Sequence, residues 1–240
     1  MCGRFTLTID TLSALAALLG VAVDPRLEKH YRPRWNVAPT QRSLMLVAEP
    51  GGARRLVEAA FGIRWPAHGD ARIAPQINAR AESVSAPTKL RALGDRRCIV
   101  PADGFYEWSG PRSDRQPFWF RAQGGGLLLF AGIHHRAPEG EGFAIVTTAA
   151  NELVAEVHDR MPAVLSPTQA KLWLESDDLA LAAAQLRTAP ADALEVRRVS
   201  KRASDVANDD AACVEPVAPR ARPSARRGAR TTDERQRKLF

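Results

Sequence analysis

The sequence predicts a single α+β domain built on a mainly antiparallel, barrel-like β-sheet with peripheral helices. Short runs of aromatic and β-branched residues, bounded by Gly and Pro, recur through the middle of the chain and are typical of strands. Helix-like segments stand only at intervals between these runs, which does not fit the regular alternation of a parallel sheet. With 240 residues, 45% of them hydrophobic and 25% charged, the chain is long and apolar enough for one sizeable core.

The N-terminal part is expected to begin with a strand and a helix. Residues 4–7 have a strand pattern, and Asp10 is placed to cap a helix that runs through Leu19 and ends at Gly20. The following segments are predicted as an ordered loop at 32–41, strands at 43–48 and 55–65 joined by the Pro50-Gly51-Gly52 turn, a loop at 66–74 and an extended segment at 76–83.

The rest of the core sequence alternates between strand patterns and three helix-like segments. Strands are expected at residues 98–100, 104–108, 117–121, 127–133, 143–148 and 195–199. Helices are expected at 151–159, where Met161-Pro162 prevents continuation, at 167–175, which has Pro at an early position, and at 178–188.

The charge distribution separates a core domain from a basic tail. Residues 218–240 hold eight basic and two acidic side chains, whereas residues 1–217 hold 26 basic and 25 acidic ones. We therefore expect one domain over residues 2–217 and a basic, disordered tail over residues 218–240. Two interpretations of the tail stay open, a sequence-independent affinity for phosphates and a solvated appendage.

Composition argues against several classes of protein. Apolar runs such as Leu127 to Ile133 are far shorter than the roughly 20 residues of a membrane helix. No basic stretch followed by an apolar run opens the chain, so no secretory signal is evident. Cys2, Cys98 and Cys213 are too few and too far apart for a disulfide framework or a zinc site. We expect a cytoplasmic protein with no membrane association, metal or cofactor.

Cys2 is the first candidate for a chemical role. Removal of Met1 is expected when a small residue follows, and it would leave the cysteine as the amino terminus. An α-amine has a pKa of about 8, so part of it is a free nucleophile near neutral pH. An imine formed by this amine could be captured by the adjacent thiol as a five-membered thiazolidine. The alternative is a tolerated cysteine without a role.

Three further residues are candidates on local grounds. In an extended segment, Asn78 points to the same face as Arg80, so an amide and a guanidinium could address one site. Glu107 lies among aromatic residues on an expected strand, where desolvation would raise its pKa and suit a proton shuttle. His158 closes an expected helix, whose dipole would favour the protonated ring. An exposed strand, a paired glutamate and a capping histidine are the respective alternatives.

Taken together, the motifs of the chain resemble a known family. They are Met1-Cys2-Gly3-Arg4-Phe5, Trp35-Asn36-Val37-Ala38-Pro39-Thr40, Ile77-Asn78-Ala79-Arg80-Ala81-Glu82, Arg97-Cys98-Ile99-Val100-Pro101 through Glu107-Trp108, Ala131-Gly132-Ile133 and His158-Asp159-Arg160-Met161-Pro162. In this order they resemble the SOS response-associated peptidase family, the abasic-site processing proteins. Weaker likeness at residues 199–202 and 208–210 extends the resemblance to about residue 215.

The resemblance implies a substrate and a role for each motif. It implies recognition of abasic sites in single-stranded DNA, with Cys2 attacking the C1′ aldehyde of the ring-opened sugar and forming a covalent cross-link. Asn78 would hold the cysteine and the sugar. Glu107 would move protons during imine formation and any β-elimination, and His158 would assist ring opening and reversal. Phosphate contacts are implied for Arg4, Arg80 and Arg160, and contacts to bases or a role in shaping the channel for Trp35, Pro39 and Trp108.

The resemblance also implies accessory activities and a setting. Release of Met1 by self-processing gives a peptidase activity, and β-elimination gives a lyase-type activity. A monomer associated with the nucleoid would fit this function. The chain departs from the family at Phe61-Gly62-Ile63-Arg64-Trp65-Pro66, where Trp-Gly-Leu and a Pro-rich segment are common. This departure concerns the stacking surface and the DNA junction, not the cysteine chemistry.

Two rival functions remain to be discriminated. N-terminal-nucleophile glutamine amidohydrolases also begin Met-Cys-Gly, but the chain has no matching Asn-Gly-Glu motif. A non-catalytic module that binds single-stranded DNA would account for the arginines and leave Cys2, Glu107 and His158 without a function.

Overall fold

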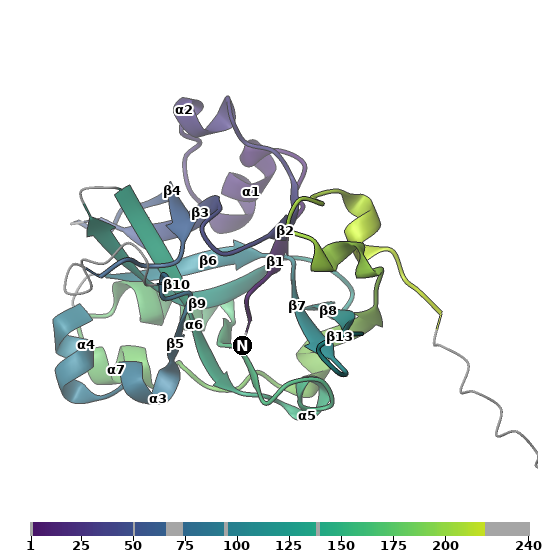
Figure 1. Cartoon of the computed structure of the whole chain (residues 1–240). Helices are drawn as coiled ribbons and strands as arrows, with labels where there is room; N and C mark the ends of the chain where they lie inside the picture. The colour runs from purple at the N-terminus through teal and green to yellow at the C-terminus, as the bar shows by residue number, and fades with distance from the viewer. Residues whose placement is uncertain (1, 50, 66–73, 94–95, 138–139, 219–240) are drawn as a thin grey trace, which may run out of the picture.

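The computed structural model describes residues 2–49, 51–65, 74–93, 96–137 and 140–218. Its strands form two sheets within these residues, and helices lie around their periphery (Figure 1). The predicted loop at 66–74 lies outside the described residues except for Ala74, and the predicted tail lies outside them except for Ala218.

The larger sheet closes on itself. Following its pairings through the described residues, β10 neighbours β4, then β3, β6 and β9, and β9 pairs again with β10. The members of this barrel are β3 (Arg42–Ala48), β4 (Arg54–Phe61), β6 (Arg97–Ala102), β9 (Leu128–Ala137) and β10 (Gly140–Ala149). Three short strands extend it: β5 (Asn78–Arg80), β11 (Arg160–Pro162) and β12 (Val164–Leu165). The pairings of β10 with β4 and β5 are parallel and the others are antiparallel, so the barrel-like, mainly antiparallel prediction is confirmed.

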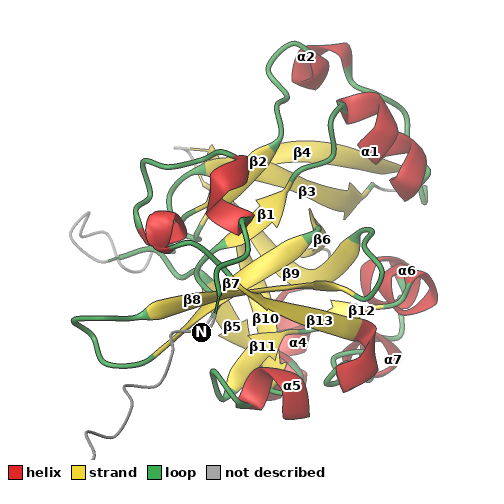
Figure 2. Ribbon diagram, turned by 90° about the vertical axis from the view of Figure 1, so that its right-hand side faces the viewer, coloured by secondary structure: helices red, strands yellow, loops and turns green. Residues whose placement is uncertain are grey.

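The second sheet packs against the barrel and runs in the order β13-β8-β7-β1-β2, with antiparallel pairing throughout (Figure 2). Its strands are β1 (Phe5–Leu7), β2 (Arg34–Val37), β7 (Gly104–Ser109), β8 (Gln116–Ala122) and β13 (Leu194–Arg198). Aromatic rings join the two sheets. Phe5 of β1 meets the ring of Phe61 edge-on at 5.4 Å, and Phe61 stacks on Phe143 at 5.4 Å.

Alternation along the barrel strands separates two apolar layers. Met45 and Val47 of β3 point into the layer shared with the second sheet, while Leu44 and Leu46 point to the layer covered by helices. The helices are α1 (Leu12–Leu19), α2 (Pro25–Glu28), α3 (Ala81–Val84), α4 (Pro87–Leu93), α5 (Glu152–Ala155), α6 (Pro167–Glu175) and α7 (Leu179–Ala183). Short 3₁₀ turns are η2 (Ala191–Ala193), η3 (Lys201–Ser204) and η4 (Ala211–Val214).

Helix boundaries follow the capping side chains. The hydroxyl of Thr11, not the carboxylate of Asp10, caps α1 by accepting a hydrogen bond from the amide of Ala14 at 3.1 Å, so that detail of the prediction is wrong. Gly20 ends α1 as predicted, because its φ of 65° is readily adopted only without a side chain. The predicted helix at 151–159 is wrong in length, since α5 ends at Ala155.

The predicted loop at 32–41 contains a strand, because a distant carboxylate completes its hydrogen bonds. Asp209 accepts the amides of Trp35 at 2.6 Å and Asn36 at 3.0 Å, and its other oxygen pairs with Arg34. β2 is therefore bonded to β1 on one side and to the C-terminal segment through Asp209. Local sequence contains no sign of a partner 173 residues away.

No helix in the described part of the chain is both long and apolar enough to cross a bilayer.

Replacing Asp209 tests this connection. Asp209→Ala leaves the partly buried Arg34 guanidinium and two β2 amides without their acceptor, so we expect a loss of about 3–5 kcal/mol in the free energy of unfolding measured by urea titration. The adjacent Asp210 forms an exposed ion pair with Arg202, so Asp210→Ala should cost much less. Equal losses for the two variants would contradict this account of β2.

Candidate functional site

Cys2 lies at the junction of the two sheets, just before β1. Its side chain is 0% exposed and packs in the apolar layer shared by the barrel and the second sheet. The thiol donates to the carbonyl oxygen of Arg4 at 3.7 Å. Burial, reinforced by the nearby charge of Glu107, raises the pKa of the Cys2 thiol well above its ordinary value. The sulfur is therefore a neutral thiol at neutral pH.

Asn78 contacts Cys2 directly. It begins β5, whose parallel pairing with β10 places Asn78 beside Ile145. Its amide nitrogen donates to the carbonyl oxygen of Cys2 at 3.0 Å. Its side-chain oxygen is buried and has no hydrogen-bond partner among the described residues. The amide thus holds the backbone of Cys2 and keeps one acceptor available for a further donor.

Glu107 is the buried acid of the site. It belongs to β7, next to β1, and is only 3% exposed. Burial raises the pKa of Glu107 to about 7, as the sequence predicted in direction. A carboxyl group with this pKa is present in both protonation states near neutral pH. It can therefore give and accept a proton, which is the property of a general acid–base group.

His158 lies between α5 and β11. The backbone N–H of Arg160 donates to Nδ1 of His158 at 3.0 Å, and the Asp159 carboxylate lies 2.9 Å from the same nitrogen. The Arg160 N–H needs a lone pair on Nδ1 and the Asp159 carboxylate needs a proton there, so these two contacts compete for the same ring nitrogen. Partial burial lowers the pKa of His158. The expectation of a protonated ring is wrong, because α5 ends before His158 and desolvation outweighs any helix dipole.

Electrostatics link three of the four predicted catalytic residues, Cys2, Glu107 and His158. The charge of Glu107 acts on Cys2, and the charge of Asp159, beside His158, raises the pKa of Glu107. Arg115 lowers the pKa values of both Glu107 and His158. The site therefore combines a buried thiol, an orienting amide, an acid that titrates near neutrality and a neutral imidazole that can donate a proton.

The three arginines predicted to contact phosphates differ in how many hydrogen bonds and ion pairs they form within the protein. Arg4 donates to the side-chain oxygen of Asn36 and the carbonyl oxygen of Ala203, both at 2.8 Å. Arg160 forms a two-pronged ion pair with Glu82, at 2.7 and 3.0 Å, and its side chain is only 14% exposed. Arg80 is exposed and has no hydrogen bond or ion pair among the described residues.

The three predicted base-contacting residues are partly buried. The indole N–H of Trp108 donates to the hydroxyl of Ser204 at 3.1 Å, and the guanidinium of Arg4 lies 5.7 Å from its ring centroid. Trp35 packs with Trp108 in the cluster beside the C-terminal segment. Pro39 precedes Thr40, whose φ of 74° is unusual for a β-branched residue. The two tryptophans are thus partly committed to packing.

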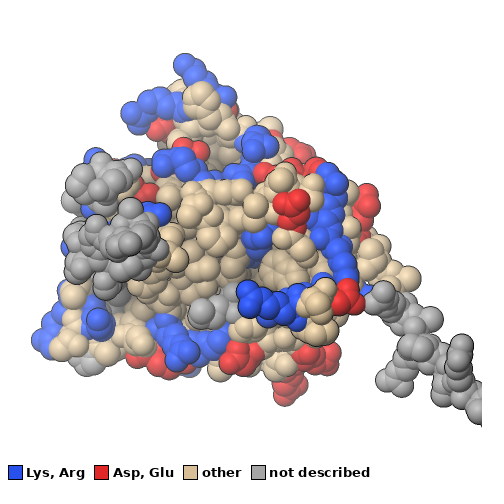
Figure 3. All heavy atoms as spheres, viewed as in Figure 1, with Lys and Arg blue, Asp and Glu red and all other residues tan. Residues whose placement is uncertain are grey.

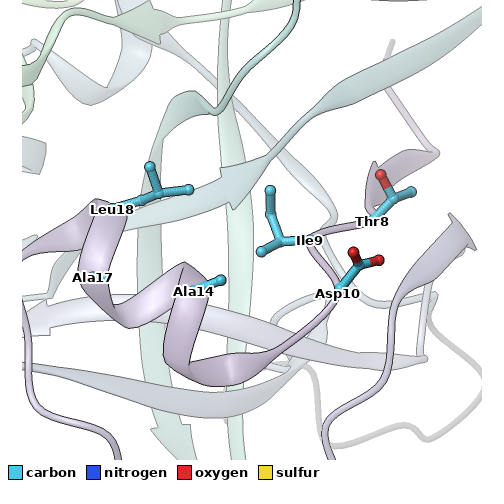
Figure 4. Close-up of a pocket in the computed structure, with 6 residues that line it drawn as sticks. All are labelled: Thr8, Ile9, Asp10, Ala14, Ala17 and Leu18. Atoms are coloured by element: carbon cyan, nitrogen blue, oxygen red, sulfur yellow. The ribbon is translucent and has the colours of Figure 1, made fainter.

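Both basic and acidic side chains lie around the start of the chain in the space-filling view of Figure 3. Figure 3 shows Lys and Arg on several sides of this area. A hollow of about 560 Å³ lies elsewhere, over α1, and is lined by Thr8, Ile9, Asp10, Ala14, Ala17 and Leu18 (Figure 4). It contains none of the candidate residues. No group of three or more His, Cys, Asp or Glu residues in the described ranges could hold a metal ion.

Comparison with known proteins decides the family. The family model described as SOS response associated peptidase (SRAP) matches residues 1–206. The chain belongs to the SRAP family. A Bacillus subtilis relative, "Abasic site processing protein YoqW", is 34% identical over 90% of this chain and 99% of its own length. "Abasic site processing protein YedK" of Escherichia coli is 32% identical over 90% of this chain and 100% of its own length.

Solved structures show the same fold. A Bacteroides thetaiotaomicron protein has a TM-score of 0.74 at 20% identity and covers 90% of this chain and 100% of that one. A phage-related protein from Bordetella bronchiseptica has a TM-score of 0.66 at 31% identity and covers 82% and 94%. The SRAP resemblance and the predicted α+β fold are confirmed.

Sequence reasoning missed two charged residues at this site. Glu82 lies within a recognised motif, but only the folded chain brings it to Arg160 on β11. Arg115 lies between β7 and β8, and neither its spacing nor its neighbours distinguishes it from other surface arginines. A strand pairing that joins residues 107 and 118 was the signal that could have placed Arg115 near Glu107.

The raised pKa of Glu107 predicts a pH-dependent stability. In the unfolded chain this carboxyl ionises near 4.5, and in the folded protein near 7, so stability falls as pH rises between these values. The full loss is roughly 3 kcal/mol. Glu107→Gln should remove it, making the variant more stable than the wild type at pH 8 by urea unfolding, with a smaller difference at pH 4.5. Glu156→Gln, at an exposed position, is the control. A wild type that gains stability relative to Glu107→Gln between pH 5 and 8 would contradict the assignment.

Proposed function

We propose that this SRAP protein captures abasic sites in single-stranded DNA through a covalent bond to Cys2. The observation that carries the proposal is the contact of one buried cysteine with Asn78, next to a glutamate whose pKa is about 7. Relatives from Bacillus subtilis and Escherichia coli are named abasic site processing proteins, which supports the same class of substrate. In this proposal the protein acts as a monomer in the cytoplasm, at the nucleoid.

Capture requires that Cys2 becomes the amino terminus. Hydrolysis of the bond between residues 1 and 2 consumes one water and releases free methionine, leaving an amine and a thiol on Cys2. We propose that the protein performs this cleavage on itself, with Glu107, a buried acid whose charge acts on Cys2, as the group that moves the proton. The hydrogen bond from Asn78 to the Cys2 carbonyl would hold the residue in place throughout.

The amine is the first nucleophile because the buried thiol is protonated. It attacks the C1′ aldehyde of the open sugar to give a carbinolamine, and loss of one water gives an imine. Protonated Glu107 supplies the proton that the departing hydroxyl needs. The thiol then adds to the imine carbon, its proton passes to Glu107, and the ring closes as a thiazolidine. Aldehyde and cysteine are thereby converted to thiazolidine and water.

His158 and Glu107 have separate further roles in this proposal. The Nε2–H of neutral His158 donates to the sugar ring oxygen as the cyclic form opens, and the same group serves reversal of the cross-link. If the imine persists, removal of a C2′ proton by ionised Glu107 leads to β-elimination of the 3′ phosphate. The lyase-type activity is then a branch of the same pathway, and ring closure by the thiol suppresses it.

DNA binding is assigned to arginines around the site. Exposed Arg80 is free to contact a phosphate, and Arg4 adds a positive charge that is bonded to neutral oxygens only. Arg160 can take a phosphate only by releasing Glu82, because that carboxylate occupies both of its terminal nitrogens. Trp35, Pro39 and Trp108 would flank the bases or shape the channel.

Cys2→Ala tests the chemistry. We expect it to abolish the adduct that survives heat and SDS on abasic single-stranded DNA, while affinity for an unreactive abasic analogue changes less than twofold. The alanine amine can still form an imine, so borohydride should trap an adduct that is unstable without reduction. Wild-type yields of heat-stable adduct from Cys2→Ala would overturn the assignment.

The same assay separates the rival functions. Binding of abasic DNA without any adduct by the wild type would favour a non-catalytic binding module, and glutamine hydrolysis would favour an amidohydrolase. Intact mass shows whether residue 1 has been removed, and a retained methionine in protein that forms the stable adduct would contradict the mechanism.

Glu82→Gln tests the competition at Arg160. Without the carboxylate, a phosphate meets an uncommitted guanidinium, so we expect about two- to fivefold tighter binding of the unreactive analogue in fluorescence anisotropy. Glu152→Gln makes the same charge change at an exposed position and measures the general effect. In an Arg160→Gln background the gain should disappear. Weaker binding by Glu82→Gln would show that the pair serves structure alone.

A further inference from the structure

The β7–β8 hairpin lies beside the segment that leads into β1 in both ribbon views (Figures 1 and 2). Ser109 pairs with Gln116 at its end, and residues 110–115 form the connection. Glu107 stands two residues before Ser109 on the same hairpin. At about 3.3 Å per residue, the connection begins roughly 10 Å from Glu107, within reach of a long side chain.

Both neighbours of Arg115 are tied to the C-terminal segment. Asp114 forms an ion pair with Lys201 of η3, and its amide donates to the carbonyl of Pro111 at 2.9 Å. The side-chain nitrogen of Gln116 donates to the carbonyl of Val199 at 2.7 Å. The backbone around Arg115 is therefore held in place from both sides.

Arg115 itself is left uncommitted. Its side chain is exposed and makes no hydrogen bond or ion pair with any described residue, unlike Arg4 and Arg160. Its charge nevertheless acts on both Glu107 and His158. A cation this close to an acid–base pair, yet bonded to neither, is available to an anion that approaches the reacting carbon.

We propose that Arg115 binds a DNA phosphate next to the abasic nucleotide, across the reaction centre from Arg80. This inference rests on the proposed function. β5, which carries Arg80, and the β7–β8 hairpin lie on either side of the start of the chain in Figure 1. Consecutive phosphates flank every nucleotide of a strand, so two uncommitted guanidinium groups on either side of Cys2 match that arrangement.

The two arginines would then position the sugar. Phosphate contacts on both sides of the lesion fix the register of the strand, so that the unstacked sugar lies over Cys2. Arg4 and Arg160 are bonded within the protein and maintain the site itself. Sequence motifs contained three of these arginines and omitted Arg115, because its position depends on the hairpin and on the C-terminal segment that holds it.

Salt dependence of binding tests the proposal. Wild type, Arg115→Gln, Arg80→Gln and Arg112→Gln are compared on a single-stranded oligonucleotide carrying an unreactive tetrahydrofuran abasic analogue, across a sodium chloride series. Each phosphate contact contributes about 0.7 to the slope of log affinity against log salt, so Arg115→Gln and Arg80→Gln should each flatten the slope by about 0.7. Arg112, exposed on the same connection, acts on neither Glu107 nor His158, and Arg112→Gln should keep the wild-type slope.

Replacing single phosphates by uncharged methylphosphonates shows which phosphate each arginine contacts. Oligonucleotides with one methylphosphonate, 5′ or 3′ of the analogue, should weaken wild-type binding at both positions. In the Arg115→Gln variant, one of the two methylphosphonates should not weaken binding any further. In the Arg80→Gln variant, the methylphosphonate on the other side should not weaken binding any further. The proposal would be overturned if the losses of affinity from the Arg115→Gln substitution and from the methylphosphonate added fully at both positions. A wild-type salt slope for Arg115→Gln would also overturn it.

The outcomes also separate this inference from the cross-linking chemistry. If the wild type forms the heat-stable adduct and Arg115→Gln keeps the wild-type slope, the phosphate contact is wrong and the capture mechanism stands. If no adduct forms while Arg115→Gln flattens the slope, the phosphate contact stands and the capture mechanism is wrong.

Discussion

Burial of a carboxylic acid beside a cysteine is the constraint on which the rest of this site depends. Glu107 and Cys2 lie where the barrel and the second sheet meet, and water cannot stabilise either in its charged form there. The carboxyl pKa rises to about 7 and the thiol stays protonated. In the proposed mechanism, this pair of shifts makes the amine of a trimmed chain the first nucleophile, and it lets the acid exchange protons at neutral pH.

Desolvation also acts on His158. A protonated ring would be poorly stabilised in a partly buried position, and the Arg160 amide already occupies Nδ1 as a donor. Glu107 is thus present in both protonation states near neutral pH, the pKa of His158 is lowered, and arginines supply the charge at the rim of the site.

The arginines fall into two groups, according to whether their guanidinium groups are bonded within the protein. Arg4 and Arg160 connect segments that are distant in sequence, Arg4 to the C-terminal segment and Arg160 to Glu82. Arg80 and Arg115 are not bonded to other described side chains. In the proposed function, a near-neutral core with a few uncommitted guanidinium groups binds the DNA backbone locally, whereas most of the overall charge of +7 comes from the tail at residues 218–240.

Sequence alone determined the barrel-like α+β fold and most of its strands, and it supplied the four residues that the proposal places at the centre. Strand alternation and turn residues are local signals, and ordered motifs identify a family even where each one is weak. Only the tertiary structure decided that β2 forms against Asp209, that burial lowers the pKa of His158, that Glu82 pairs with Arg160, and that the charge of Arg115 acts on Glu107. Each of these depends on a partner far along the chain or on burial. Such contacts and desolvation energies arise only when the sheets close, so no local pattern records them.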